Sequence, residues 1–311
     1  MEKIYDVIIV GAGPAGYTAG IYSARAGHSV LMIAGSLPGG QLVNTTDVEN
    51  FPGFDQGIQG PELMKLMRKQ TEKFGTEIII DKVVRVDFSS KPFNVFTKSK
   101  TFKSQSVIIA TGASHRKLGL DSEHVFEGRG VSYCAICDGP LFKGQELVVV
   151  GGGDAAMEEA IFMAKFAKKI HVLHRGSKNE LRASKIMQER AFNIKKIEFH
   201  FNTEVKEIKG DTKVREIIVI NNKTHKLSTI KTAAVFIAIG QVPSTEIFKN
   251  HLTLDKKGFI VMKKNTQTSV GGVFAAGDVH DYTYRQAVTA AGYGCMAALD
   301  LDKYLKASEK H

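Results

Sequence analysis

The sequence predicts an α/β protein made of two Rossmann-like domains, each with three layers (ββα), the second domain being inserted into the first. One observation is a repeated plan. An apolar strand, a glycine-rich turn, a helix and another apolar strand occur at 5–33 and recur at 147–173. The other observation is that no third glycine-rich turn of this kind follows, so the tail completes a domain begun earlier. We therefore expect a first domain from residues 1–115 and 244–311, and an inserted second domain from residues 116–243.

The composition agrees with a globular protein of this size. The 311 residues are enough for two ordinary domains, and 43% are apolar and 24% charged. No apolar run reaches the roughly 18 residues that a membrane span needs, and the amino terminus lacks the features of a secretory signal. The net charge of +10 comes from scattered basic residues. We therefore expect a solvated basic surface, with neither nucleic acid nor a membrane as partner; an acidic protein partner is the alternative.

The expected elements of the first domain follow from apolar periodicity and from helix start and stop signals. A proline is tolerated in the first turn of a helix, and glycine commonly ends one. In chain order we expect a strand at 5–10, a helix from Pro14 to Ala26, a strand at 29–33, a helix from Pro61 that stops at Gly75, an antiparallel meander of runs at 77–80, 83–88 and 93–96, and a buried strand at 107–110.

The second domain repeats the plan. We expect a strand at 147–150, a helix that continues through Lys168, a strand at 170–173, short alternating runs between 197 and 232, and a strand at 235–238. The tail adds an apolar strand within 272–278 and a long helix from Arg285 to about Leu305, both assigned to the first domain.

The first glycine-rich turn, Gly11-Ala12-Gly13-Pro14-Ala15-Gly16, predicts a nucleotide-binding domain. The first glycine permits a tight turn, the second lets the backbone approach a pyrophosphate, and the third lets the helix pack on the strand. Because a strand precedes it and a helix follows, we expect a dinucleotide at this helix N-terminus rather than a purely structural turn. The acid that usually binds a ribose about twenty residues later is absent. We assign Ala110, Thr111 and Gly112, at the end of the strand at 107–110, to the same site.

The second turn has the sequence Gly151-Gly152-Gly153-Asp154-Ala155-Ala156, and its final alanine is an accepted variant. About twenty residues later, cations stand where a ribose-binding acid would favour NADH. These cations are His174, Arg175, Lys178 and Arg182. Cationic side chains suit a 2′-phosphate, so we expect NADPH in preference to NADH. The alternative is an exposed basic loop without a ligand.

Cys134 and Cys137 form a Cys-x-x-Cys motif, and Asp138 follows directly. Redox, metal and structural roles compete for such a pair. A zinc site needs four ligands, and the chain has neither a second Cys-x-x-Cys nor paired histidines at metal spacing, so we expect redox chemistry and no metal. A working dithiol among only three cysteines favours a reducing cytoplasm. The third cysteine, Cys295, lies on the expected last helix, and we expect it to be a buried core residue.

Asp278 follows an apolar strand and precedes a helical stretch, in Ala276-Gly277-Asp278. It can cap the helix, because aspartate is a good N-cap residue. It can also hydrogen-bond the ribityl or phosphate groups of a flavin, given the first glycine-rich turn. The two roles are compatible.

Taken together, these motifs resemble the low-molecular-weight, bacterial-type thioredoxin reductases, within the FAD-dependent pyridine nucleotide-disulfide oxidoreductases. The resemblance covers essentially the whole chain. It rests on Gly11–Gly16, Gly39–Leu42, Glu49–Gly53, Cys134–Gly139, Gly151–Ala156, Ala276–Asp278 and Arg285–Ala287.

The resemblance implies roles for single residues. FAD would be lined by Gln41, Asn50, Asp278 and Gln286, together with Gly40, Leu42, Gly277, Arg285 and Ala287. Cys137 would lie beside the flavin, Cys134 would attack the substrate disulfide, and Asp138 would manage the proton. Electrons would pass from NADPH to FAD, to the disulfide and then to thioredoxin, in a homodimer. The inserted domain would rotate about tethers at 113–118 and 241–246.

One departure from the family pattern bears on the coenzyme. The family commonly has His-Arg-Arg, whereas this chain has His174-Arg175-Gly176, and Arg182 lies two residues later than usual. Lys178 would be the compensating cation. The alternative functions are a flavin disulfide reductase of this fold with another electron donor or another dithiol partner and, more remotely, a basic binding module without catalysis.

Overall fold

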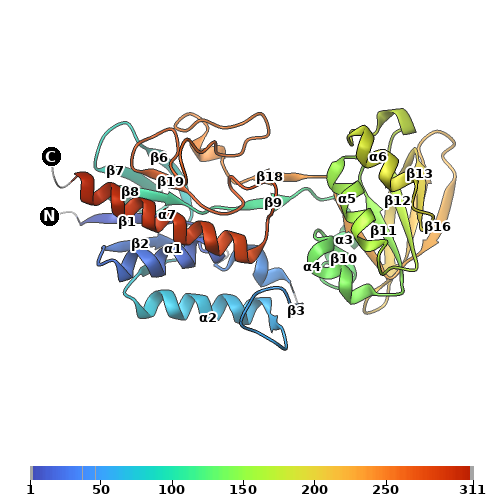
Figure 1. The fold of residues 1–311 in the computed structure, drawn as a ribbon, viewed down its shortest axis with the longest axis horizontal. Helices are drawn as coiled ribbons and strands as arrows, with labels where there is room; N and C mark the ends of the chain where they lie inside the picture. Colours follow the sequence, from blue (N-terminus) through green and yellow to red (C-terminus); the bar gives the residue numbers. More distant parts are fainter. Residues whose placement is uncertain (1–2, 37, 46, 309–311) are drawn as a thin grey trace. The chain divides into compact units, whose positions relative to one another are not determined.

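The computed structural model describes residues 3–36, 38–45 and 47–308. The chain forms two compact units. Met1–Ser114 and Val242–His311 make the first, and His115–Gln241 make the second. In Figure 1 the two ends of the chain, blue and red, belong to the same unit, and the green-to-orange middle forms the other. The second unit is therefore an insertion into the first, as the sequence predicts.

A mixed sheet forms the centre of the first unit. Its strands are β1 (Ile4–Val10), β2 (Val30–Ile33), β5 (Glu77–Ile79), β6 (Val83–Asp87), β7 (Phe93–Thr97), β8 (Thr101–Ile109) and β19 (Val273–Ala275). The order β5-β2-β1-β8 is parallel, and β19 pairs in parallel with the second half of β8. The first half of β8 pairs with β7, and β7 with β6, in an antiparallel meander.

Helices cover one face of the parallel strands (Figure 1). They are α1 (Pro14–Arg25), α2 (Gly60–Lys73) and α7 (Ala287–Ser308). Because side chains alternate along a strand, Ile9 and Met32 pack against these helices, whereas Ile8 and Leu31 pack against the meander and the segment around Phe248. The smaller elements of this unit are η1 (Gly40–Asn44), β3 (Asp47–Val48), β4 (Ile58–Gln59) and η4 (Glu246–Phe248).

The second unit repeats the three layers. Its parallel sheet has the order β10-β17-β11-β12-β13. The strands are β10 (Val131–Ser132), β11 (Glu146–Val150), β12 (Lys169–His174), β13 (Ile197–Phe201) and β17 (Ala234–Ile237). An antiparallel sheet of β14 (Thr203–Gly210), β15 (Val214–Asn221) and β16 (Leu227–Lys231) covers one face.

The other face of this parallel sheet packs against α5 (Asp154–Met163) and α6 (Lys185–Phe192). Val149, Val172 and Phe236 point to these helices, whereas Val148 and Leu173 point to the antiparallel sheet. The remaining elements are α3 (Asp121–Phe126), α4 (Ala135–Asp138), η2 (Gly139–Phe142) and η3 (Lys178–Glu180). The α/β class with two Rossmann-like ββα domains is thereby confirmed.

Two local predictions are wrong. The run at 77–80 is not part of the meander, because β5 pairs in parallel with β2 and the third meander strand is β8. The helix α5 ends at Met163 rather than Lys168. It stops because the carbonyl of Phe166 accepts from the amide of Gly144 and the amide of Lys168 donates to the carbonyl of Gln145, which binds this segment to the preceding loop.

The connections between the units form a ribbon, β9 (Ala113–His115) against β18 (Gln241–Pro243). The amide of Ser244 donates to the carbonyl of Gly112 at 3.0 Å, and the amide of Arg116 donates to the carbonyl of Gly240 at 3.0 Å. The two expected tethers are therefore joined to each other by hydrogen bonds.

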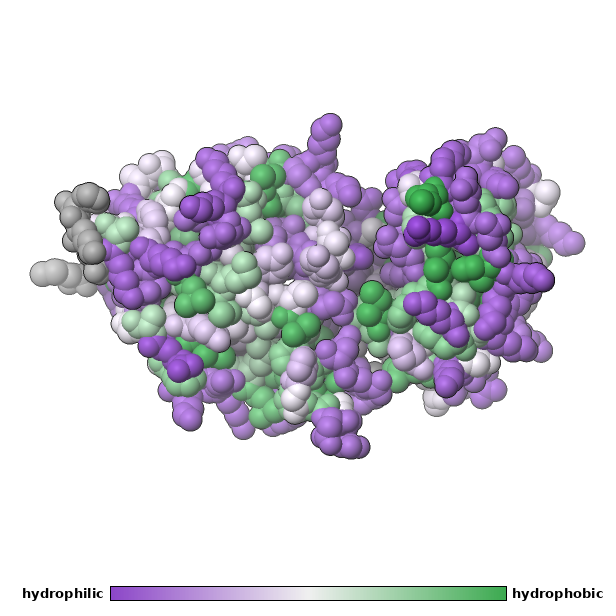
Figure 2. Space-filling view, in the orientation of Figure 1, coloured by the Kyte–Doolittle hydropathy of each residue, from purple (hydrophilic) through white to green (hydrophobic). Residues whose placement is uncertain are grey.

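The surface visible in Figure 2 is mainly hydrophilic in both units, and hydrophobic residues form small separate areas on it. In the part of the chain that the structure describes, none of the helices has the length and hydropathy needed to cross a bilayer.

Candidate functional site

The first glycine-rich turn has a geometry that requires glycine. Gly11 has φ +108°, and a Cβ there would lie 2.3 Å from the carbonyl oxygen of Ala110. A Cβ on Gly16 would lie 2.1 Å from the carbonyl oxygen of Gly11. The turn, the first turn of α1 and the end of β8 are thus packed backbone to backbone. This close packing brings Ala110 against the turn.

The N-terminus of α1 is available to a ligand. Gly13 is its N-cap residue, no side chain caps it, and Pro14 occupies the first turn. A Cβ on Gly13 would meet nothing within 4 Å, so the space beside it is open. The first amides of a helix have no partner within the helix, and they favour an anion. A pyrophosphate therefore fits this end of α1.

The segment from Gly39 to Leu42 lies beside this turn. The amide of Gly39 donates to the carbonyl of Ala12 at 2.8 Å, and a Cβ on Gly40 would lie 3.6 Å from Cα of Gly13. The Nε2 of Gln41 donates to the carbonyl of Ala113. Leu42 packs against the helical core of the unit. The predicted residues Gly40 and Gln41 are therefore held close to the end of α1.

Asp278 lies next to the same turn. A Cβ on the preceding Gly277 would lie 3.0 Å from Cβ of Ala15, so this backbone passes directly over the first turn of α1. Burial, together with the nearby charge of Asp281, raises the pKa of Asp278 to about 6, and Arg285 acts in the opposite direction. The structure thus places a largely buried carboxyl group beside the helix end.

The Arg285-Gln286-Ala287 motif is held at the start of α7 by Asp281. The Asp281 carboxylate accepts from the amides of Thr283, Tyr284 and Arg285, which fixes the turn before the helix. The Nδ2 of Asn50 donates to Oε1 of Gln286 at 3.3 Å, so two of the predicted flavin residues are in contact.

Two buried nitrogen atoms in this region lack a hydrogen-bond partner among the described residues. They are Nε of Arg285 and Nε2 of His280. Burial lowers the pKa of His280 to about 4, which keeps its ring neutral. Buried polar groups normally have partners, so these atoms indicate a polar ligand. Together with the open end of α1, they fit the phosphate and ribityl groups of FAD.

The second glycine-rich turn repeats this geometry in the second unit. A Cβ on Gly151 would lie 2.5 Å from the carbonyl oxygen of Ala238 and 2.7 Å from Cβ of Ala156. Gly153 is the N-cap residue of α5, no side chain caps this helix, and the space beside Gly153 is open. The turn therefore fits a second dinucleotide.

Part of the predicted basic loop is bound to this turn. A Cβ on Gly152 would lie 2.4 Å from Nδ1 of His174, and the carbonyl of Gly152 accepts from the amide of Arg182 at 2.8 Å. Oδ1 of Asp154 accepts from the amide and the hydroxyl of Ser184. Burial lowers the pKa of His174, so the ring beside the turn is neutral.

The other two predicted cations are placed differently. Arg175 and Lys178 are both exposed. The Lys178 ammonium lies over the ring of Phe192, 4.5 Å from its centroid, which gives it a partner in the protein. Glu180 accepts from the amide and hydroxyl of Ser177 and adds a negative charge to the loop. Among the loop cations, Arg175 and Arg182 remain the better candidates for a phosphate.

The Cys-x-x-Cys motif is a disulfide in the structure. Cys134 and Cys137 are bonded, with their Cα atoms 5.3 Å apart. Cys134 is the N-cap residue of the short helix α4, and its sulfur accepts from the amide of Cys137 at 3.2 Å. Cys134 is half-buried and Cys137 is exposed.

Ser132 links the acid to the disulfide. Its hydroxyl donates to Oδ2 of Asp138 at 2.5 Å and accepts from the amide of Cys134 at 3.1 Å. Burial raises the pKa of Asp138, and the hydrogen bond from Ser132 partly offsets this. A carboxyl group with a raised pKa, one turn from a disulfide, is suited to proton transfer.

Several residues that the structure brings to these sites carry no signal in the sequence. Ser132 and Asp281 act through hydrogen bonds that no motif indicates. A further cluster of His171, Glu198 and His200 lies in the second unit. The spacing of Glu198 and His200 indicates two possible ligands on one face of an expected strand. It does not indicate that the strand with His171 lies beside them.

Known proteins are similar to this chain along its whole length. Residues 5–294 match the family described as pyridine nucleotide-disulphide oxidoreductase. A thioredoxin reductase of Streptomyces coelicolor is 52% identical over 310 residues, which cover 99% of this chain and 96% of that protein. The NADPH-dependent thioredoxin reductase 3 of Arabidopsis thaliana is 47% identical over 98% of this chain and 59% of its own length. The crystal structure of thioredoxin reductase from Streptococcus pyogenes aligns with a TM-score of 0.94 and 43% identity, covering 99% of this chain and 100% of that chain.

Proposed function

The chain belongs to the pyridine nucleotide-disulphide oxidoreductase family and, within it, to the low-molecular-weight, bacterial-type thioredoxin reductases, and from this premise we propose how it works. Electrons pass from NADPH through FAD and the Cys134–Cys137 disulfide to oxidised thioredoxin. The observation that carries the proposal is a Cys-x-x-Cys disulfide in the same unit as one uncapped glycine-rich turn, with a second such turn in the other unit.

The first unit would hold FAD, which supplies a two-electron carrier when bound. The amides after Gly13 would bind its pyrophosphate, and Asp278 would hydrogen-bond its ribityl or phosphate groups. The buried Nε of Arg285 would find its partner in the same ligand. Gln41, Asn50 and Gln286 would position the remainder of the molecule.

The second unit would bind NADPH at the N-terminus of α5. Arg175 and Arg182 would contact the 2′-phosphate. Unlike Lys178, neither of them has an aromatic ring or an acid of the loop as its partner. The Arabidopsis relative named as NADPH-dependent supports this choice. The single arginine after His174 favours an alternative in which a reductase of this fold uses another electron donor.

Thiol–disulfide exchange would follow once the disulfide is reduced. The Cys134 thiolate attacks one sulfur of the thioredoxin disulfide and forms a mixed disulfide, and the other thioredoxin sulfur leaves as a thiolate. The Cys137 thiolate then attacks Cys134, which releases reduced thioredoxin and restores the Cys134–Cys137 bond. Asp138, held by Ser132, would give and take the proton of the neighbouring sulfur.

The insertion implies a motion. The disulfide and the coenzyme turn both belong to the second unit, whereas the flavin residues belong to the first. One flavin ring cannot meet both in a single arrangement while a cysteine exchanges with a protein in solution. We therefore propose two orientations of the second unit, related by rotation about the ribbon of β9 and β18.

The chain would act in the cytoplasm as a homodimer.

The test is the reaction itself. The purified protein should be yellow, and NADPH should reduce its flavin in the absence of air. With thioredoxin from the same organism, NADPH oxidation should release one dithiol per coenzyme. Cys134→Ser should abolish this reaction while retaining FAD, and Cys295→Ser should leave it unchanged, because Cys295 lies on α7 of the other unit.

The outcomes separate the alternatives. A colourless protein would indicate the binding module. A yellow protein that NADPH and NADH both fail to reduce would indicate another electron donor. A flavin that NADPH reduces without any turnover of thioredoxin would indicate another dithiol partner.

A further inference from the structure

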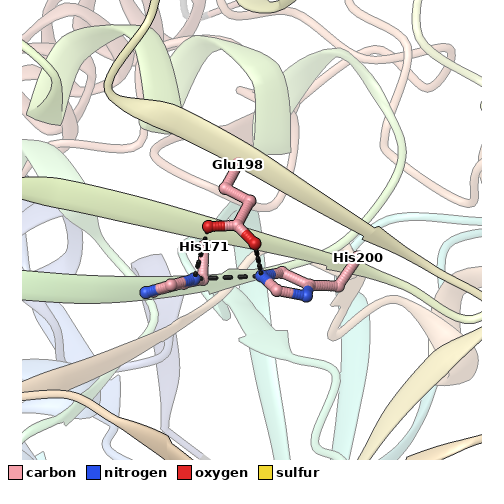
Figure 3. Close-up of side chains that lie close together, drawn as sticks. All are labelled: His171, Glu198 and His200. Carbon is pink, nitrogen blue, oxygen red and sulfur yellow. Dashed lines mark hydrogen bonds and ion pairs between the residues drawn. The ribbon is translucent and has the colours of Figure 1, made fainter.

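A cluster of two histidines and a glutamate lies on adjacent strands of the second unit. His171 is on β12, and Glu198 and His200 are on β13 (Figure 3). Nδ1 of His171 lies 2.9 Å from Nε2 of His200. Oε2 of Glu198 is 3.9 Å from Nδ1 of His171, and its other oxygen, Oε1, is 3.5 Å from Nε2 of His200. With one carboxylate oxygen as the ligand, the three ligand atoms lie within 4.8 Å of one another. Three possible ligand atoms therefore point to one place.

The strand register explains this convergence. His171 pairs with Glu198 and Leu173 pairs with His200, so the three side chains leave the same face of two neighbouring strands. The glycine-rich turn follows the carboxyl end of β11, whereas Glu146, at the amino end of β11, lies 3.9 Å from Nε2 of His171. The cluster is therefore separate from the coenzyme turn and from the disulfide.

We propose that His171, Glu198 and His200 bind a divalent transition-metal ion of the Zn²⁺ class. Two imidazoles and a carboxylate are a common ligand set for zinc. Ligands about 2.0–2.1 Å from a tetrahedral ion lie about 3.3 Å from one another. The three ligand atoms lie within 4.8 Å of one another, and the two ring nitrogens are 2.9 Å apart. To complete the site, the rings must separate slightly and the Glu198 side chain must rotate toward them.

The close contact between the two rings favours a bound ion. Two ring nitrogens that face each other at 2.9 Å need a proton between them, because two lone pairs would repel. A metal ion takes the place of that proton. The proton moves to the outer nitrogen of the same ring, and for His171 that nitrogen faces Glu146, an arrangement that orients metal-bound histidines.

The surroundings leave one ligand position open to solvent. His171 is buried, whereas Glu198 is exposed, so the site opens to solvent and a water can be the fourth ligand. Lys169 forms an ion pair with Glu198 and Lys168 with Glu146, and these cations compete with the metal. The ion would join β13, the edge strand of the parallel sheet, to β12.

The test uses untagged, oxidised holoenzyme, in which the disulfide removes Cys134 and Cys137 as ligands. Co²⁺ is titrated as the probe, because tetrahedral Co²⁺ has visible absorbance at wavelengths beyond the flavin bands. We expect one Co²⁺ per chain, displaced by Zn²⁺, and a higher melting temperature when Zn²⁺ is added. Glu198→Gln and His200→Ala should each weaken binding more than about tenfold. His124→Ala, which removes an exposed histidine from α3 of the same unit, should bind as the wild type does.

His171→Ala removes a buried side chain and requires a check of folding by circular dichroism. The test therefore uses variants of the half-buried His200 and the exposed Glu198. Absence of Co²⁺ and Zn²⁺ binding to the wild type at micromolar concentrations would overturn the proposal. Binding that survives both His200→Ala and Glu198→Gln would overturn it equally, as would binding only after reduction of the disulfide.

Discussion

At the scale of single residues, two cations of the basic loop, Arg175 and Lys178, can be compared as a test variant and its control. Arg175 and Lys178 are both exposed cations, but Lys178 lies over Phe192. We expect Arg175→Ala to raise the KM for NADPH by about ten- to a hundredfold, since a charge-assisted contact to a phosphate is worth about 1.5–3 kcal/mol. Lys178→Ala should change it far less. Steady-state kinetics with NADPH and NADH check this, and equal changes for both coenzymes would show that Arg175 does not contact the 2′-phosphate.

Asp278 predicts a pH dependence of stability. Its pKa rises from the ordinary 3.8 to about 6 because the carboxyl group is buried. The folded state therefore binds this proton more tightly than the unfolded state, and stability falls as the pH rises between about 4 and 6. The difference of roughly two pKa units corresponds to about 3 kcal/mol. In flavin-free protein, Asp278→Asn should remove this loss.

Urea unfolding at pH 4, 5, 6 and 7 measures the effect. The free energies of unfolding of wild type and Asp278→Asn should diverge from pH 4 to 6 and run parallel above it. Asp211→Asn changes an exposed carboxylate and serves as the control. Parallel curves for wild type and Asp278→Asn over the whole range would mean that Asp278 ionises as easily in the folded state as in the unfolded one.

At the scale of elements, the sequence predicts what local pattern determines. β1, α1 and β2 lie within one or two residues of their expected positions, because an apolar run, a glycine-rich turn and a helix follow one another without a gap. The partner of β5 cannot be predicted, since a three-residue strand carries no signal that distinguishes a parallel neighbour from an antiparallel one. α6 was not predicted, because its eight residues carry little apolar periodicity.

The candidate sites divide in the same way. The glycines and the Cys-x-x-Cys are visible as motifs because backbone geometry restricts their residue types. Ser132, Asp281 and the cluster at His171 depend on contacts across the fold, and only the structure reveals them. The contact of Lys178 with Phe192 is also tertiary, so the sequence alone does not distinguish Lys178 from Arg175.

The short helix α4 gives a prediction about the two sulfurs. Exposure alone favours Cys137 as the attacking thiol, whereas the family resemblance assigns that role to Cys134. Cys134→Ser should leave a Cys137 thiolate beside the flavin and give long-wavelength charge-transfer absorbance. Cys137→Ser should lack this band. Both variants should retain FAD and lose thioredoxin reduction, and the band appearing only in Cys137→Ser would reverse the assignment.

At the scale of the whole molecule, the ribbon of β9 and β18 is where any rotation between the units must occur. Gly112 and Gly240 lie at its ends with φ of +68° and +101°, and a Cβ on either would meet nothing within 4 Å. These glycines are therefore not required by packing. Glycine passes between positive and negative φ at little cost, which suits a backbone that changes conformation.

This freedom leads to a prediction about turnover. Alanine at positive φ costs about 1–2 kcal/mol, so Gly240→Ala should shift the balance between the two proposed orientations by up to about thirtyfold. The ratio of kcat with thioredoxin to the rate of flavin reduction by NADPH should change accordingly, while FAD content stays the same. Gly144→Ala is the matched control, because Gly144 also has positive φ (+75°) and open space but lies within the second unit, away from the ribbon. If both variants change the ratio equally, the effect comes from general destabilisation, and the ribbon is not the hinge.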